Sequence, residues 1–106
     1  MNKQNIEEFV KGWVVGNFVP SIFKTNEVEV GAKFFKIGES EPSHKQLVAT
    51  EITIVMDGKI RMNNEYFNSG DVITIPPGEF ADFEALTDAK LICIKFPSIP
   101  SDRVLE

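Results

Sequence analysis

The stretch that decides the fold runs from Gly38 to Gly58 and reads GESEPSHKQLVATEITIVMDG. It contains the only histidine of the chain, His44, and a run of β-branched residues that ends at the dipeptide Asp57-Gly58. Such residues favour strands, and Asp-Gly is a strong signal for a two-residue hairpin. We therefore expect a strand within residues 46–56 that turns back into a second strand over residues 59–62.

The rest of the chain has the same character of short apolar runs separated by turn residues. Further strands are predicted over residues 27–37, 65–67, 72–75, 80–86 and 91–96. A short helical turn behind an Asn5 cap is predicted over residues 6–10, and Pro97 and Pro100 indicate an irregular tail. The expected organisation is an N-terminal arm at 1–26, a β domain at 27–97 and a C-terminal tail at 98–106.

The composition is that of one globular domain, with 106 residues, 25% charged residues and a net charge of -5. The basic residues are scattered, so nucleic acid is not an expected partner. No apolar run approaches the roughly 18 residues that span a bilayer, and Glu7 and Glu8 interrupt the segment where a secretory signal would be apolar. We expect a cytoplasmic protein without a membrane partner, in which the single cysteine, Cys93, is a buried thiol.

Seven residues recur at the separations of a known two-part motif. They are Gly38, His44, Glu51 and Gly58 in the first part, and Gly70, Pro76 and Gly78 in the second. This pattern resembles the signature of the cupin family, and the short connection between the two parts is similar to that of small single-domain bacterial, RmlC-like cupins. The resemblance implies an all-β fold, the double-stranded β-helix or jelly-roll β-barrel.

In that family, three histidines and one carboxylate hold a metal ion inside the barrel. The corresponding positions here are His44, Gln46, Glu51 and Ala81, so an amide and a methyl group replace two imidazoles. One imidazole, one carboxylate and one neutral amide oxygen form a poor ligand set. The resemblance therefore implies at most a weakly bound divalent metal at His44, Gln46 and Glu51, and the absence of a cofactor is favoured.

Strand periodicity also bears on where these side chains point. His44 and Gln46 are two residues apart and share one face, whereas Glu51 is an odd number of residues further on. A bend or bulge between residues 47 and 50 is therefore required to bring Glu51 to the same interior. Ala81 leaves room for an organic ligand, and Phe83, on the same strand face, is predicted to form the floor of the pocket.

Two functions are compatible with these residues. The favoured one is a non-catalytic module that binds or senses a small molecule, for example a sugar derivative. The alternative is a metal-independent or weakly metal-dependent isomerase or epimerase of a sugar or related polar metabolite, as in some cupin-like enzymes, with His44 as general base, Glu51 orienting it and Tyr66 as general acid. A purely structural role for His44 and Glu51 also remains open.

The arm contains the apolar segment WVVGNFVPSIFK at residues 13–24. In small cupins such arms often pair with a neighbouring subunit, which predicts a homodimer. The alternative is that the arm packs on its own barrel.

Overall fold

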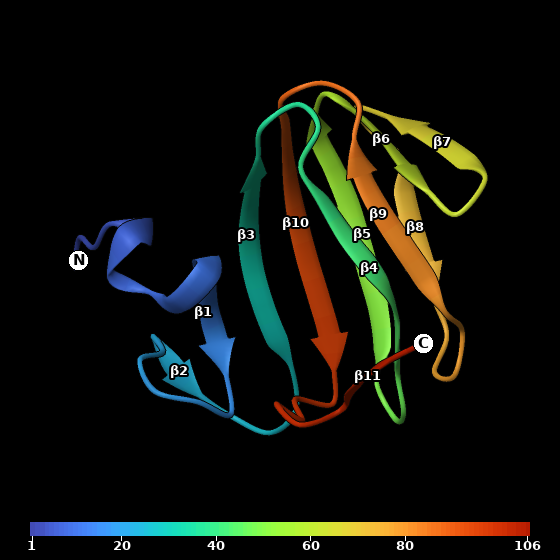
Figure 1. Ribbon diagram of the computed structural model, residues 1–106. Coiled ribbons are helices and arrows are strands. Elements are labelled where there is room, and N and C mark those ends of the chain that lie inside the picture. The colour runs from blue at the N-terminus through green and yellow to red at the C-terminus, as the bar shows by residue number, and fades with distance from the viewer.

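The computed structural model describes residues 1–106, which form two β-sheets packed face to face (Figure 1). The first sheet has the order β2 (Phe23–Lys24), β1 (Trp13–Gly16), β3 (Glu29–Phe35), β10 (Ala89–Phe96), β5 (Thr50–Asp57) and β8 (Val72–Ile75). The second has the order β11 (Arg103–Leu105), β4 (Ser40–Gln46), β9 (Ala81–Ala85), β6 (Lys59–Met62) and β7 (Glu65–Asn68). All neighbouring strands are antiparallel except β1 and β2. The predicted all-β jelly roll is confirmed.

The hydrophobic core lies between the two sheets. Val55 and Ile60 are fully buried there, and Phe83 and Leu91 are nearly so. These residues come from β5, β6, β9 and β10, where alternate side chains point inward and so supply both inner faces of the sandwich.

The first residues form two short 3-10 turns, η1 (Ile6–Glu8) and η2 (Val10–Gly12). Asn5 caps η1 as predicted, because its side-chain oxygen accepts a hydrogen bond from the Glu7 backbone N–H. Neither turn is long enough to cross a membrane, and no other helix is present.

The arm extends the first sheet of its own chain. Strand β1 pairs with β3, and Trp13 lies opposite Gly31 in the register. A Cβ atom at Gly31 would come within 2.7 Å of the Trp13 ring, so glycine here makes room for the indole. The apolar residues of the arm are therefore partly covered within one chain, and the homodimer remains a prediction.

The dipeptide Asp57-Gly58 does not form the predicted hairpin. It ends β5 in one sheet and leads into β6 in the other, and these two strands do not pair. Gly58 has a φ of 93°, and a Cβ atom there would lie 2.2 Å from the carbonyl oxygen of Asp88. Glycine is thus required by a left-handed backbone and by close approach of a second loop, which are the same local demands that a hairpin makes.

Residues 46–56 are not one strand, because Gln46 ends β4 and Thr50 begins β5. Only the end of β4, the extended segment from His44 to Gln46, was anticipated, since the strand sequence SEPSHKQ is polar and contains Pro42. The pairing of β4 with β9 shifts register between Glu41 and His44, which accommodates the proline beside an irregularity of the ladder.

The C-terminal tail is also ordered, contrary to the prediction of an irregular segment. Strand β11 pairs with β4. Just before it, the buried Asp102 carboxylate accepts hydrogen bonds from the backbone N–H groups of Val48 and Ala49 at 2.8–3.1 Å. Three strand residues are too few to give a periodic signal, so the sequence pattern could not reveal this pairing.

Candidate functional site

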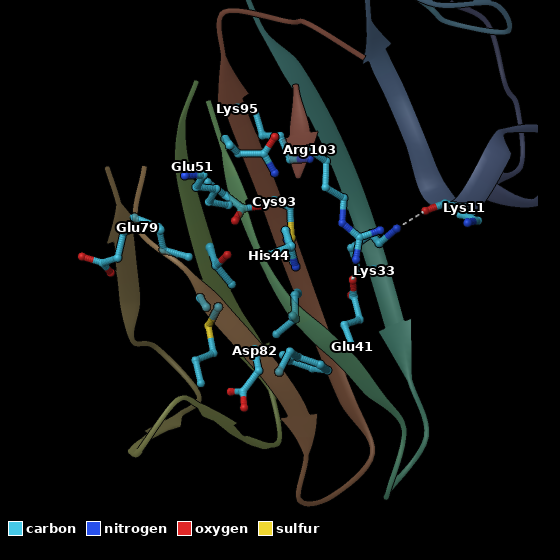
Figure 2. Close-up of a pocket in the computed structure, with 18 of the residues that line it drawn as sticks. Lys11, Lys33, Glu41, His44, Glu51, Glu79, Asp82, Cys93, Lys95 and Arg103 are labelled. Carbon is cyan, nitrogen blue, oxygen red and sulfur yellow. Dashed lines mark hydrogen bonds and ion pairs between the residues drawn. The ribbon is translucent and has the colours of Figure 1, made fainter. Parts of the chain in front are cut away.

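A cavity of about 230 Å³ lies between the two sheets, and five of its lining residues were singled out from the sequence. These are His44 and Gln46 on β4, Glu51 on β5, and Ala81 and Phe83 on β9. Figure 2 shows His44 and Glu51 on facing strands, with Cys93 between them. The cavity is smaller than the 300–1,000 Å³ of most drug-binding pockets, which sets a limit on the size of any ligand.

A bend at Leu47 and Val48 brings Glu51 to this interior. The chain crosses from one sheet to the facing sheet there, so the inward faces of β4 and β5 look toward each other. The bend required between residues 47 and 50 is therefore present, as a crossing between sheets. Hydrogen bonds to Asp102 hold it in place.

The imidazole of His44 has a defined tautomer when it is neutral. Its Nδ1 lies 3.0 Å from the backbone oxygen of Pro42. A carbonyl oxygen only accepts, so Nδ1 carries the proton and Nε2 keeps its lone pair. No hydrogen bond or ion pair joins His44 to Glu51 in the structure, where the backbone carbonyl of Pro42 is the partner of the ring. The orienting role of Glu51 stays a prediction.

Glu51 is desolvated without gaining a direct partner. Burial raises the pKa of its carboxyl group, while the positive charges of Lys95 and His44 act in the opposite direction. Burial dominates because no ion pair with either group forms. The folded protein therefore binds a proton at Glu51 more tightly than the unfolded chain does.

The substitution Glu51→Gln is expected to raise the melting temperature at about pH 7 and to raise it less at about pH 4. A raised pKa in the folded state means that stability is lost as the pH rises through it, and glutamine removes this loss. Thermal unfolding at several pH values measures the effect. The matched control is Glu65→Gln on the exposed surface of β7, and an equal response of both variants would contradict the prediction.

Gln46 is a deeply buried polar residue at the wall of the cavity. Its side chain is only 5% exposed, and its Nε2 has no hydrogen-bond partner. A buried N–H group without an acceptor is unfavourable by about 1–3 kcal/mol, so such groups are rare in folded proteins.

Ala81 and Phe83 form an apolar wall beside these polar groups. Ala81 lies opposite His44 in the β4–β9 register, so a methyl group occupies the position next to the imidazole. Phe83 is 5% exposed and packs against Phe35, with 4.5 Å between the ring centroids.

Tyr66 does not lie at this site. It is on β7, its side chain is 69% exposed, and it does not line the cavity. The structure therefore does not bring the proposed general acid to His44. Tyr66 and Phe67 are consecutive residues of β7, so their side chains point to opposite faces of the sheet, Phe67 inward and Tyr66 outward. The sequence pattern alone did not show which of the two points inward.

Several lining residues were not anticipated as site residues. They are Trp13 from the arm, Lys33 on β3, Lys95 on β10 and Arg103 on β11. The period of two in Leu91, Cys93 and Lys95 could have placed Lys95 on the inner face. Cys93 is buried, as predicted, and burial raises the pKa of its thiol to about 12.

The weak metal site expected at His44, Gln46 and Glu51 stays a prediction. No three His, Cys, Asp or Glu side chains are grouped to hold an ion. The methyl group of Ala81 stands where a ligand would be needed, and His44 is the only imidazole. One imidazole and one carboxylate supply only two of the four ligands that the motif usually provides.

Comparisons with known proteins agree with this architecture. No protein-family model and no curated protein matches the chain. Among solved structures, an uncharacterized protein with a double-stranded β-helix domain from Klebsiella pneumoniae is similar over 97% of this chain and 89% of its own, with a TM-score of 0.73 and 16% identity.

Two further solved structures show the same likeness over the barrel. An RmlC-like cupin from Shewanella frigidimarina is similar over 71% of this chain and 70% of its own, with a TM-score of 0.66 and 19% identity. KdgF from a Halomonas species is similar over 72% and 74%, with a TM-score of 0.65 and 20% identity. The chain therefore has the cupin fold, and the likeness extends to the fold alone.

Proposed function

We propose that the protein binds a small polar organic molecule in the cavity between its sheets and acts as a binding or sensing module. The observation that carries this proposal is the Gln46 amide, which is buried at the cavity wall with its Nε2 unpaired. A ligand acceptor atom would satisfy this donor and remove the penalty for its burial.

The other polar groups of the cavity support the same proposal. His44 presents a free Nε2, and Glu51 is desolvated without a partner. The walls formed by Phe35, Phe83 and other apolar side chains would cover the carbon skeleton of the ligand. A few convergent polar groups in an apolar cavity are typical of small-molecule sites.

The substitution Gln46→Leu tests the proposal in two measurements. Leucine has a similar shape and leaves no donor unpaired, so we expect the free protein to gain about 1 kcal/mol in its free energy of unfolding. The same variant should lose the rise in melting temperature that small sugars and organic acids produce in the wild type. Gln4→Leu, on the exposed arm, is the control for replacing a glutamine, and unchanged ligand-induced stabilisation in the Gln46 variant would contradict the proposal.

The tautomer of His44 favours a second candidate, an isomerase or epimerase that uses Nε2 as a base. In the same experiment, each stabilising compound is incubated with the protein and followed by NMR. Conversion that disappears in His44→Ala would establish the enzyme and replace the binding module. Stabilisation without conversion supports the binding module.

A further inference from the structure

Positive charge is concentrated at the cavity of this acidic protein. Five of the 11 basic residues of the chain line it, against four of the 16 acidic residues. The basic ones are Lys11, Lys33, Lys45, Lys95 and Arg103, and the acidic ones are Glu41, Glu51, Glu79 and Asp82. This balance opposes the net charge of -5 of the whole chain.

Most of the acidic groups are not available to neutralise the lysines. Asp82 binds Arg61, which lies outside the cavity, at 3.0 Å, and Glu41 binds Arg103 at 3.8 Å. Figure 2 shows the carboxylates of Glu79 and Asp82 pointing away from the centre of the site. Glu51 faces the cavity but forms no ion pair.

Of the five basic residues, only Arg103 forms an ion pair, and Lys33 and Lys95 are the two unpaired lysines that share the Trp13 ring. Both ammonium groups lie over the Trp13 ring, at 5.1 and 4.9 Å from its centroid. The Nζ of Lys33 also donates to the backbone oxygen of Lys11 at 2.7 Å. An aromatic face and one carbonyl oxygen attract cations, but neither carries a compensating negative charge.

The environment of Lys33 shows that this arrangement is unfavourable in the free protein. Burial lowers the pKa of its ammonium group, and the nearby charges of Lys11 and Lys95 lower it further, against the effects of Cys93 and Glu41. Two like charges at a half-buried wall repel each other, and an anion placed between them would reverse the sign of the interaction.

We infer that the ligand of the cavity is a small organic carboxylate, whose charged group binds at Lys33 and Lys95 beside Trp13. This inference rests on the proposed function and specifies the chemical class of its ligand. A carboxylate only accepts hydrogen bonds and so matches ammonium donors, and its second oxygen or a neighbouring oxygen would accept from the Gln46 amide. The apolar walls at Phe35 and Phe83 favour an anion with a carbon skeleton over an inorganic one.

The experiment uses a series of carboxylates from propionate to benzoate, the uncharged amide of each, and inorganic phosphate. Trp13 is the only tryptophan, and it contacts both lysines, so its fluorescence reports occupancy directly. Calorimetry provides independent dissociation constants at fixed ionic strength. We expect at least one carboxylate to bind about tenfold more tightly than its amide.

The variants Lys33→Met and Lys95→Met keep an apolar side chain and remove the charge. Each is expected to weaken carboxylate binding about tenfold and to leave amide binding unchanged. Lys90→Met, an exposed position on β10, is the matched control and should bind like the wild type. Melting temperatures verify that each variant is folded, and a desolvated Lys33 predicts that Lys33→Met is at least as stable as the wild type without ligand.

The outcomes separate this inference from the proposed function. If carboxylates and amides bind with equal affinity, or if neither lysine substitution changes the affinity, the inference of a carboxylate ligand is wrong. The proposal of small-molecule binding would still stand. Binding of phosphate alone also overturns it. If no compound of the series binds, the inference fails, whereas the proposed function is decided separately by the response of Gln46→Leu to sugars and other polar compounds.

Discussion

Replacing Phe83 by alanine is expected to reduce the free energy of unfolding by about 4 kcal/mol. The ring is 5% exposed and belongs to the cluster that includes Val55, Ile60 and Leu91. It also packs against Phe35 on the facing sheet, so its removal opens a void between the two sheets. Because the same ring lines the ligand cavity, the variant should also lose affinity for any compound that contacts this wall.

Urea denaturation measures this loss, provided that the slope of unfolding free energy against urea is unchanged. Phe83→Leu keeps most of the volume and should lose about 1 kcal/mol. Phe34→Ala is the control. Phe34 precedes Phe35 on β3 and is 60% exposed, so its replacement should change stability by no more than about 0.5 kcal/mol. A similar loss in the Phe34 and Phe83 variants would show that Phe83 is not central to the core.

Replacing Asp102 by alanine is expected to reduce the free energy of unfolding by about 3 kcal/mol. The carboxylate is 3% exposed and accepts from the backbone N–H groups of Val48 and Ala49. Alanine would leave both donors, the buried one of Ala49 and the part-buried one of Val48, without this acceptor. For a domain whose total stability is about 5–15 kcal/mol, this is a large fraction.

The matched variant Asp102→Asn keeps one acceptor oxygen and should lose less than half as much as the alanine variant. Amide hydrogen exchange at Val48 and Ala49 gives a local measurement, because both N–H groups should exchange faster in the alanine variant. Loss of stability without faster exchange at these two positions would show that Asp102 acts elsewhere. The connection from His44 and Gln46 to Glu51 passes through this bend, so ligand binding should weaken in parallel.

The fold and one side of the cavity follow from local features of the sequence. Gly38 and Gly58 have positive φ angles, and the number of residues between them is set by the connection from one sheet to the other. Both features can be read directly from the sequence. Five of the six anticipated site residues line the cavity, all except Tyr66. Their alternation on β4 and β9 required only a period of two.

The other side of the cavity depends on pairings between distant segments. Trp13 reaches the cavity because β1 lies beside β3, and Arg103 because β11 lies beside β4. The β11–β4 pairing leaves no local signal, since β11 has three residues and β4 is polar with an internal proline. The hairpin expected at Asp57-Gly58 failed for a related reason: a tight turn looks alike whether the next strand pairs with the previous one or joins the opposite sheet.

The cavity is lined by side chains from Lys11 to Arg103, and this span has a consequence for biosynthesis. As the chain leaves the ribosome, β3 and β4 emerge early but must wait for β10 and β11, their partners in the two sheets. A nascent chain that stops short of β10 lacks a core strand and exposes the apolar inner faces, and a chain that stops short of Arg103 lacks part of the cavity lining. The cavity is therefore completed late in translation, and prematurely terminated chains are expected to be substrates for chaperones and proteases.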